Sequence, residues 1–144
     1  MKKIDKFIIR LLASFSIAGA FLSIVISLIS IFYPEGLTWV SKIPGYANIK
    51  LIHDDATWVY PYVKIVFYAI SFLGAYELFY FKKRGFWWYF FAQLALLILP
   101  YFTWNKTPLL VFISDLPDVY MTVAFVGSYA LYYRYFSGAA GSEK

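Results

Sequence analysis

Four long apolar stretches account for most of the 144 residues, and they constrain the fold more than any other feature. Each holds close to the ~20 apolar residues that an α-helix needs to cross a hydrocarbon core ~30 Å thick. We therefore predict an all-α fold, a membrane-spanning four-helix bundle in one domain. The predicted spans cover about 7–33, 59–81, 86–104 and 117–136, with outer loops at 34–58 and 105–116 and a flexible tail at 137–144.

Composition narrows the class of protein further. The chain is 62% hydrophobic and 15% charged, whereas a soluble domain is nearer ~45–50% apolar and ~25% charged. It has no cysteine and a single histidine, His53, which excludes disulfides, thiolate metal centres and bis-histidine haem. No nucleophile, phosphate-binding or zinc-protease motif is present. We therefore expect no enzyme activity and no cofactor.

The basic residues gather at one end of the predicted spans. Nine of the 13 flank the termini and the turn between the second and third spans: Lys2, Lys3, Lys6, Arg10, Lys82, Lys83, Arg84, Arg134 and Lys144. The positive-inside rule then predicts that both termini lie in the cytoplasm, with Lys82, Lys83 and Arg84 as anchors to anionic lipid. The net charge of +5 is assigned to topology and lipid contact, because no nucleic-acid-binding motif accompanies it.

The start of the chain shares features with a signal peptide. Residues 2–10 are basic, and Ala18-Gly19-Ala20 has the small side chains of a cleavage site. The apolar run nevertheless continues to Tyr33, well beyond a signal-peptide core of ~7–15 residues. We expect an uncleaved first span.

Small side chains recur along the first span at helical spacing. Alternating steps of three and four residues separate Ala13, Ser16, Ala20, Ser23, Ser27 and Ser30, and Gly19 lies beside them. Residues with this spacing share one face of a helix. In lipid, small residues mark a surface that another helix approaches closely. This small-residue seam is therefore predicted to contact protein, either the other helices of the bundle or a second subunit.

The first outer loop is long and aromatic, which suits a segment lying at the membrane interface. Its candidate contact residues are Trp39, Tyr46, His53, Asp54 and Asp55. A loop of this length is more often functional or docked than idle. Three adjacent donors at His53, Asp54 and Asp55 point in different directions, which disfavours a tetrahedral metal site. We expect these residues to be solvated or to contact a partner.

Polar residues inside the predicted spans are few. Glu77 lies one turn before the basic turn, so a structural ion pair is the favoured interpretation and a proton or ion pathway the alternative. Gln93 is expected to hydrogen-bond across helices rather than to contact a ligand. Lys64 lies about one turn inside the second span and should extend its amine outward to water.

Proline interrupts the region before the fourth span. Residues 109–113 are too few to span a membrane, and Asp115 and Pro117 follow them. We expect an interfacial turn at 109–113. The fourth helix is predicted to begin at Pro117, since proline suits the first helical turn and Asp118 is favourable near a helix N-terminus.

The turn between the second and third spans has a distinctive pattern. Gly74-Ala75-Tyr76 precedes Phe81-Lys82-Lys83-Arg84-Gly85-Phe86, and Tyr89 follows on the next helix. This pattern resembles a loose group of small four-span bacterial inner-membrane proteins of unknown function. The resemblance implies a multi-pass protein of the bacterial plasma membrane and a tight bundle. It implies no activity and no functional residue.

These features favour a non-catalytic function. We predict an accessory or scaffold subunit that contacts membrane lipids and packs against a larger inner-membrane complex, such as an ion-driven motor or transport assembly. One alternative is a small homo-oligomeric transporter or channel, lined by the serines of the first span, Gln93 and Glu77. A second alternative is a lipid- or quinone-binding membrane protein, because the Trp and Tyr groups could cover an apolar tail. No nucleic-acid partner is expected.

Overall fold

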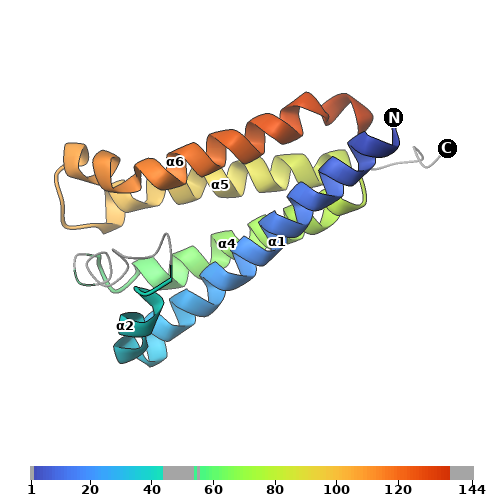
Figure 1. Ribbon diagram of the computed structural model, residues 1–144. Helices are drawn as coiled ribbons and strands as arrows, with labels where there is room; N and C mark the ends of the chain where they lie inside the picture. Colours follow the sequence, from blue (N-terminus) through green and yellow to red (C-terminus); the bar gives the residue numbers. More distant parts are fainter. Residues whose placement is uncertain (1, 44–53, 55, 137–144) are drawn as a thin grey trace.

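The computed structural model describes residues 2–43, 54 and 56–136 (Figure 1). Its four long helices are α1 (Lys3–Phe32), α4 (Tyr60–Phe79), α5 (Lys83–Thr103) and α6 (Pro108–Leu131). The short elements are η1 (Pro34–Gly36), α2 (Leu37–Val40) and η2 (Tyr133–Tyr135). The described ranges contain no strand, and an isolated bridge pairs Ala56 with Trp104. All four long helices are long and apolar enough to cross a membrane, which confirms the prediction of a multi-pass, all-helical fold.

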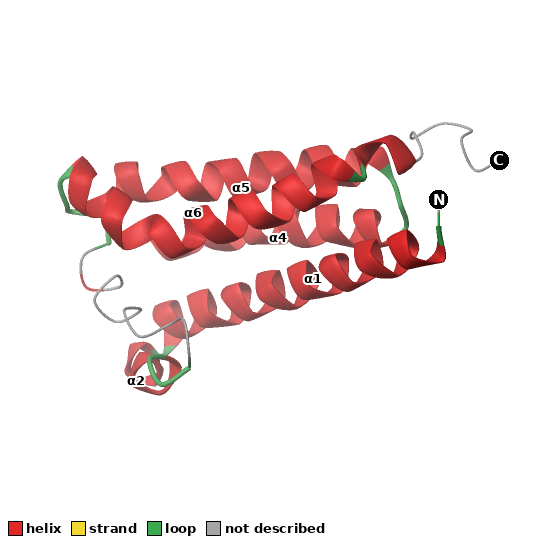
Figure 2. Ribbon diagram, turned by 45° about the horizontal axis from the view of Figure 1, so that its top comes forward, coloured by secondary structure: helices red, strands yellow, loops and turns green. Residues whose placement is uncertain are grey.

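The four helices form a bundle that is closed at one end and splayed at the other. Helix α4 packs against both α1 and α5, and α5 packs against α6. Helices α1 and α6 approach each other where the chain begins and ends, and they diverge toward the end that carries α2 (Figures 1 and 2). We call these two ends the terminal end and the α2 end.

Local signals explain where α1 and α4 begin and end. The Asp5 carboxylate accepts the backbone N–H of Lys2 at 3.2 Å, which is one half of a capping box. Helix α1 ends at Phe32, and Pro34 then opens η1. Helix α4 carries Pro61 in its first turn, where the missing N–H of proline has no partner to lose.

Helix α6 differs from the prediction. It begins at Pro108 rather than Pro117, and Pro117 lies inside it. The interfacial turn predicted over 109–113 is therefore wrong, as is the part of the outer loop 105–116 that follows Pro108. An internal proline removes one helical hydrogen bond. A membrane offers no water to replace the remaining bonds, so the helix continues through it.

The terminal end has the tightest packing. A Cβ atom at Gly74 would lie 2.6 Å from the Tyr89 backbone nitrogen, and one at Gly85 would lie 2.6 Å from the Gly74 carbonyl oxygen. These two glycines therefore allow backbone contact between α4 and α5, as small residues do in membrane bundles. Around them lies a buried cluster made of Ile9, Ala13, Ala75, Leu78, Phe86, Tyr89, Tyr129 and Phe136.

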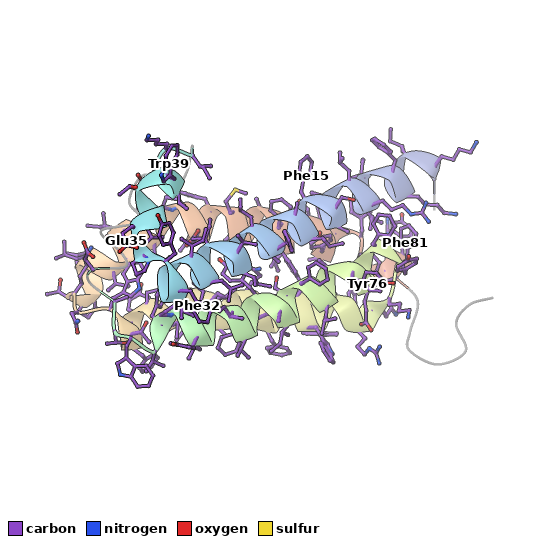
Figure 3. The ribbon with its side chains drawn as sticks, turned by 90° about the horizontal axis from the view of Figure 1, so that it is seen from below. Phe15, Phe32, Glu35, Trp39, Tyr76 and Phe81 are labelled. Atoms are coloured by element: carbon purple, nitrogen blue, oxygen red, sulfur yellow. The ribbon has the colours of Figure 1, made fainter. Side chains whose placement is uncertain are left out.

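The short helix α2 folds against the far end of α1. Its Leu37 and Val40 are buried together with Ile26 of α1. The Trp39 side chain of the same helix is 71% exposed, and it lies on the outside of the molecule (Figure 3). Helix α2 thus covers the far end of α1.

Candidate functional site

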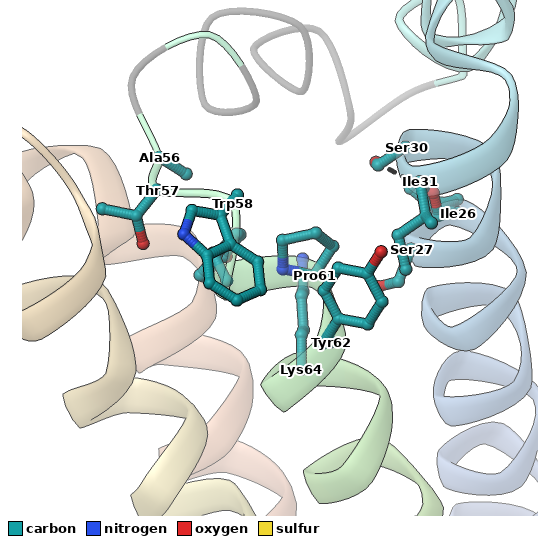
Figure 4. A pocket seen from close by; sticks show the side chains of 11 residues that line it. Ile26, Ser27, Ser30, Ile31, Ala56, Thr57, Trp58, Pro61, Tyr62 and Lys64 are labelled. Atoms are coloured by element: carbon teal, nitrogen blue, oxygen red, sulfur yellow. Dashed lines mark hydrogen bonds between the residues drawn. The ribbon is translucent and has the colours of Figure 1, made fainter.

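A cavity of about 350 Å³ lies at the α2 end, between α1 and the start of α4 (Figure 4). Its lining combines apolar and aromatic groups with a few hydroxyls and one amine. The residues are Ile26, Ser27, Ser30, Ile31, Ala56, Thr57, Trp58, Tyr60, Pro61, Tyr62 and Lys64. A volume and a lining of this kind are typical of small-molecule sites.

Lys64 supplies the positive charge of the cavity. It lies just over one turn inside α4. Its ammonium is 5.2 Å from the ring centroid of Tyr60 and 5.7 Å from that of Tyr68, both within the ~6 Å range of cation–π contacts. Asp118 of α6 lies within electrostatic range of the ammonium, although the two form no ion pair. Two helices therefore contribute to the surroundings of this one amine.

Two carboxyl groups of α6 lie within electrostatic range of Lys64. Asp115 and Asp118 are three residues apart, which places them on one face of the helix. Asp115 is only 4% exposed, and its carboxyl group interacts with both Asp118 and Lys64. Asp118 is exposed. The structure thus places one lysine and two aspartates within electrostatic range of one another between membrane-spanning helices, and we call these three residues the charged cluster.

Our interpretation of the sequence missed the charged cluster. It placed Asp115 in the outer loop and Asp118 at a helix N-terminus, because it began the fourth helix at Pro117. It also treated Lys64 as an amine extended to water. One sequence feature could have indicated the cluster: the apolar stretch continues on both sides of Pro117. A single helix that starts at Pro108 places both aspartates two to three turns from its start.

Gln93 joins three helices deeper in the bundle. Its side-chain amide donates to the Ser71 hydroxyl of α4 at 2.8 Å. Its amide oxygen accepts from the Thr122 hydroxyl of α6 at 3.4 Å. Gln93 therefore makes the interhelical contacts that its place in the third span predicted.

A second hydrogen-bonded group lies near the terminal end. The Ser16 and Tyr129 hydroxyl oxygens are 2.8 Å apart, and Ser16 also donates to the Tyr89 hydroxyl at 3.4 Å. The Tyr89 and Tyr129 rings meet edge to face at 5.2 Å. All three residues are buried. This group ties α1, α5 and α6 together where α1 and α6 approach each other.

The small-residue seam of α1 is largely covered by this chain. Ala13, Ser16, Ala20, Ser23 and Ser27 are buried, and Ser30 is half-buried and lines the cavity. Gly19 differs from the rest, because it is exposed and a Cβ atom there would meet nothing within 4 Å. Of the two predicted partners for the seam, the other helices of the bundle account for the buried members.

Glu77 forms an ion pair with Arg84. The Arg84 Nε atom donates to both Glu77 carboxylate oxygens at 3.0 Å, and an Arg84 Nη atom completes the bidentate contact. The Glu77 side chain is 15% exposed. The pair joins α4 to α5 at the terminal end, away from the charged cluster, so it matches the structural interpretation of Glu77.

The other predicted residues that the structure describes do not line the cavity. Trp39 packs its ring against the Lys42 amine at 4.5 Å, and Asp54 is exposed. Tyr46, His53 and Asp55 lie outside the described residues. At the terminal end, Lys82 is exposed, while Lys83 lies over Tyr133 at 5.5 Å and Arg84 over Trp88 at 5.9 Å.

The site can bind charge, but its residues do not form a metal centre. In the part of the chain that the structure describes, no group of three or more His, Cys, Asp or Glu residues is placed to hold a metal ion. The chemistry on offer is one ammonium, two carboxyls and several hydroxyls beside aromatic rings. Comparison of the chain with protein-family models, curated proteins and solved structures found no match, so its chemistry is judged from these residues.

Proposed function

We propose that the protein is a small membrane transporter whose splayed half binds a zwitterionic solute, one that carries both an amino and a carboxyl group. The observation behind this proposal is the charged cluster, whose Lys64 lines the cavity and has Asp115 and Asp118 in electrostatic range. Ionisable groups between membrane-spanning helices are costly, and they generally serve substrate or ion pathways. This replaces the accessory subunit as the favoured function and promotes the transporter alternative.

The chemistry of the cluster favours a solute with charges of both signs. Lys64 would pair with the solute carboxylate, and the exposed Asp118 would accept its ammonium group. A purely anionic or cationic solute would leave one protein charge without its partner, which is costly away from water. The rings of Trp58, Tyr60 and Tyr62 would cover the apolar part of the solute.

The terminal half would act as the closed gate of such a transporter. The hydrogen bonds of Gln93 and Ser16 join the helices in the interior of the bundle, on the side of the cavity toward the terminal end. Transport would require α1 and α6 to close at the α2 end and separate at the terminal end, as alternating access demands. The predicted path through Glu77 is not retained, because its carboxylate is held by Arg84.

We place the α2 end outside a bacterial plasma membrane and both termini in the cytoplasm. The basic residues at the terminal end support this orientation. A reporter enzyme that works only in the cytoplasm should be active when it is fused to either terminus. Activity on opposite faces would overturn the orientation.

Cysteine accessibility tests the open half directly, because the chain has no cysteine of its own. We expect Ser30→Cys, in the cavity lining, to react with a membrane-impermeant maleimide added from the α2 side. The matched variant Ser16→Cys, buried near the terminal end, should be protected. Equal protection of both cysteines would show that the cavity is not open to that side.

Solute binding is tested by thermal unfolding of the purified protein in detergent with glycine, acetate and methylammonium as probes. A bound solute raises the unfolding midpoint, so glycine should raise it more than either singly charged probe. Lys64→Gln should remove the glycine effect. Glycine uptake into proteoliposomes then separates transport from binding alone. Equal midpoints with all three probes would contradict the zwitterion proposal.

A second candidate function is the accessory subunit predicted from sequence. The observation that favours it is the poor coverage of α6: 11% of its most apolar stretch is buried, against 22–28% in the other three long helices. A partner helix could cover the face that carries Tyr120 and Val123, which are 70% and 64% exposed. Purification in a mild detergent with a larger protein in fixed ratio, cross-linked through Val123→Cys, would support it.

A further inference from the structure

A second hollow lies on the lipid-facing side of the bundle, toward the terminal end. It is a shallow groove of about 500 Å³ between α1 and α4. Its main lining residues are Ile17, Ala18 and Phe21 of α1 and Phe72, Tyr76 and Phe79 of α4. From Phe72 to Phe79 the groove extends about 10 Å, at ~1.5 Å per helical residue. This length suits part of one acyl chain.

A cation stands at the head of this groove. The Arg10 guanidinium lies 5.4 Å from the ring of Phe79, which lines the groove, and 5.3 Å from the ring of Phe81. Phe81 and Tyr76 both lie toward the terminal end (Figure 3). Stacking on two rings limits the guanidinium to a few orientations and leaves its N–H groups free to bond an anion in a bidentate way.

The acidic residues near Arg10 are engaged elsewhere. Glu77 pairs with Arg84, the one ion pair among the described residues, and Asp5 accepts the N–H of Lys2. Arg10 and the nearby Lys6 are both exposed. Among the described residues neither Arg10 nor Lys6 forms an ion pair, so the head of the groove carries net positive charge beside an apolar surface.

We propose that Arg10 and this groove bind an anionic phospholipid from the membrane leaflet at the terminal end. Arg10 holds the phosphate, and one acyl chain lies in the groove between α1 and α4. The combination of a fixed cation with a continuous apolar groove selects a molecule that is anionic at one end and apolar at the other. A transmembrane helix from a second copy would fill the apolar part, but the Glu77 carboxylate at its terminal end is already paired with Arg84.

The test is native mass spectrometry of the full chain released from nanodiscs with equal amounts of phosphatidylglycerol and phosphatidylcholine. The wild-type protein should retain phosphatidylglycerol preferentially. Arg10→Gln should lower phosphatidylglycerol retention about tenfold, the loss expected for a charge-assisted bidentate contact. Arg134→Gln is the matched control, because Arg134 is also exposed and also stacks on a ring, that of Tyr135, yet lies away from the groove. It should leave retention unchanged.

The groove is tested separately by Ala18→Phe, which fills it with a larger side chain. This variant should also lose phosphatidylglycerol, whereas Ala124→Phe on the exposed side of α6 should not. Equal losses for Arg10→Gln and Arg134→Gln would overturn the proposal in favour of diffuse electrostatic attraction. Unselective retention of both lipids, or unchanged retention in Ala18→Phe, would also overturn it. A dimer that Ala18→Phe converts to a monomer would assign the groove to a second copy.

Unfolding midpoints measured in the same detergent verify that each variant is folded. If Arg10→Gln does not fold, Arg10→Lys takes its place. This variant keeps the charge but loses the planar fork of the guanidinium. It should still lower phosphatidylglycerol retention, and unchanged retention would count against a phosphate site at Arg10.

Discussion

In the terminal half of the bundle, buried hydroxyl groups are paired with one another, and α4 and α5 touch through glycine. In the α2 half, α1 and α6 separate, and Lys64 lines a cavity with Asp115 and Asp118 in electrostatic range. The Ser16 hydroxyl in the first half bonds to Tyr129 at 2.8 Å, whereas Lys64 in the second half has aromatic and acidic neighbours. The contrast indicates that one half holds the fold together and the other is available to bind a ligand. Substitutions in the two halves should therefore have different consequences.

The largest expected effect is on the contact between α4 and α5. Gly74→Ala and Gly85→Ala should each lower the free energy of unfolding by about 1–3 kcal/mol, because the added Cβ atom meets backbone that cannot move aside. Thermal or denaturant unfolding in detergent measures this loss. Gly127→Ala is the control, since its Cβ atom would meet nothing within 4 Å. Equal stability of Gly85→Ala and Gly127→Ala would show that the helices do not touch as described.

A smaller loss is expected from the buried hydroxyl group of Tyr129. Tyr129→Phe keeps the ring and removes the hydrogen bond to Ser16, which should lower stability by about 1 kcal/mol. The same unfolding measurement detects it. Tyr120→Phe provides a control at a ring that is 70% exposed, and it should behave like the wild type. If the two variants are indistinguishable, the closed half does not depend on this hydrogen bond.

Removal of the ion pair at the terminal end should have a still smaller effect. Glu77→Gln keeps the size of the side chain and removes its charge. Arg84 is 53% exposed, so water can solvate its guanidinium once the carboxylate is gone. We expect a slight fall in the unfolding midpoint, less than that of Tyr129→Phe, and no change in glycine uptake. Loss of uptake in a stable Glu77→Gln protein would return Glu77 to the transport path.

The smallest effect on stability is expected at Lys64. Among the described residues Lys64 forms no ion pair, so replacing it does not break a salt bridge, and Lys64→Met should unfold close to the wild-type midpoint. Glycine should nevertheless fail to stabilise this variant. Loss of stability comparable to Gly74→Ala would mean that Lys64 holds the bundle together rather than serving a ligand.

Much of the helical architecture was predictable from hydropathy. The spans predicted at 7–33, 59–81 and 86–104 correspond to α1, α4 and α5 within a few residues. The seam of α1 and the interhelical role of Gln93 were also foreseeable, because helical spacing alone places such residues on one face. Helix α6 was misjudged because Pro117 was read as a helix start. A lone proline stops a helix in water more readily than in lipid.

The charged cluster was beyond the reach of sequence. Lys64 lies on α4, and Asp115 and Asp118 lie on α6, two helices later in the chain. Whether these side chains meet depends on how far each helix is rotated and how its axis crosses the others. Hydropathy carries little information on either, because in lipid apolar faces gain nothing by turning toward each other.

The sequence alone determined the number of long helices, their approximate lengths and the basic character of the terminal end. These are local properties, set by the thickness of a hydrocarbon core and by the charges that flank each apolar stretch. Only the tertiary structure decided that α1 and α6 meet at one end and separate at the other, and that Lys64 of α4 lies within electrostatic range of two aspartates of α6. Close contact at Gly74 and Gly85 and hydrogen bonds around Ser16 set those helix positions, and such contacts join residues far apart in the chain.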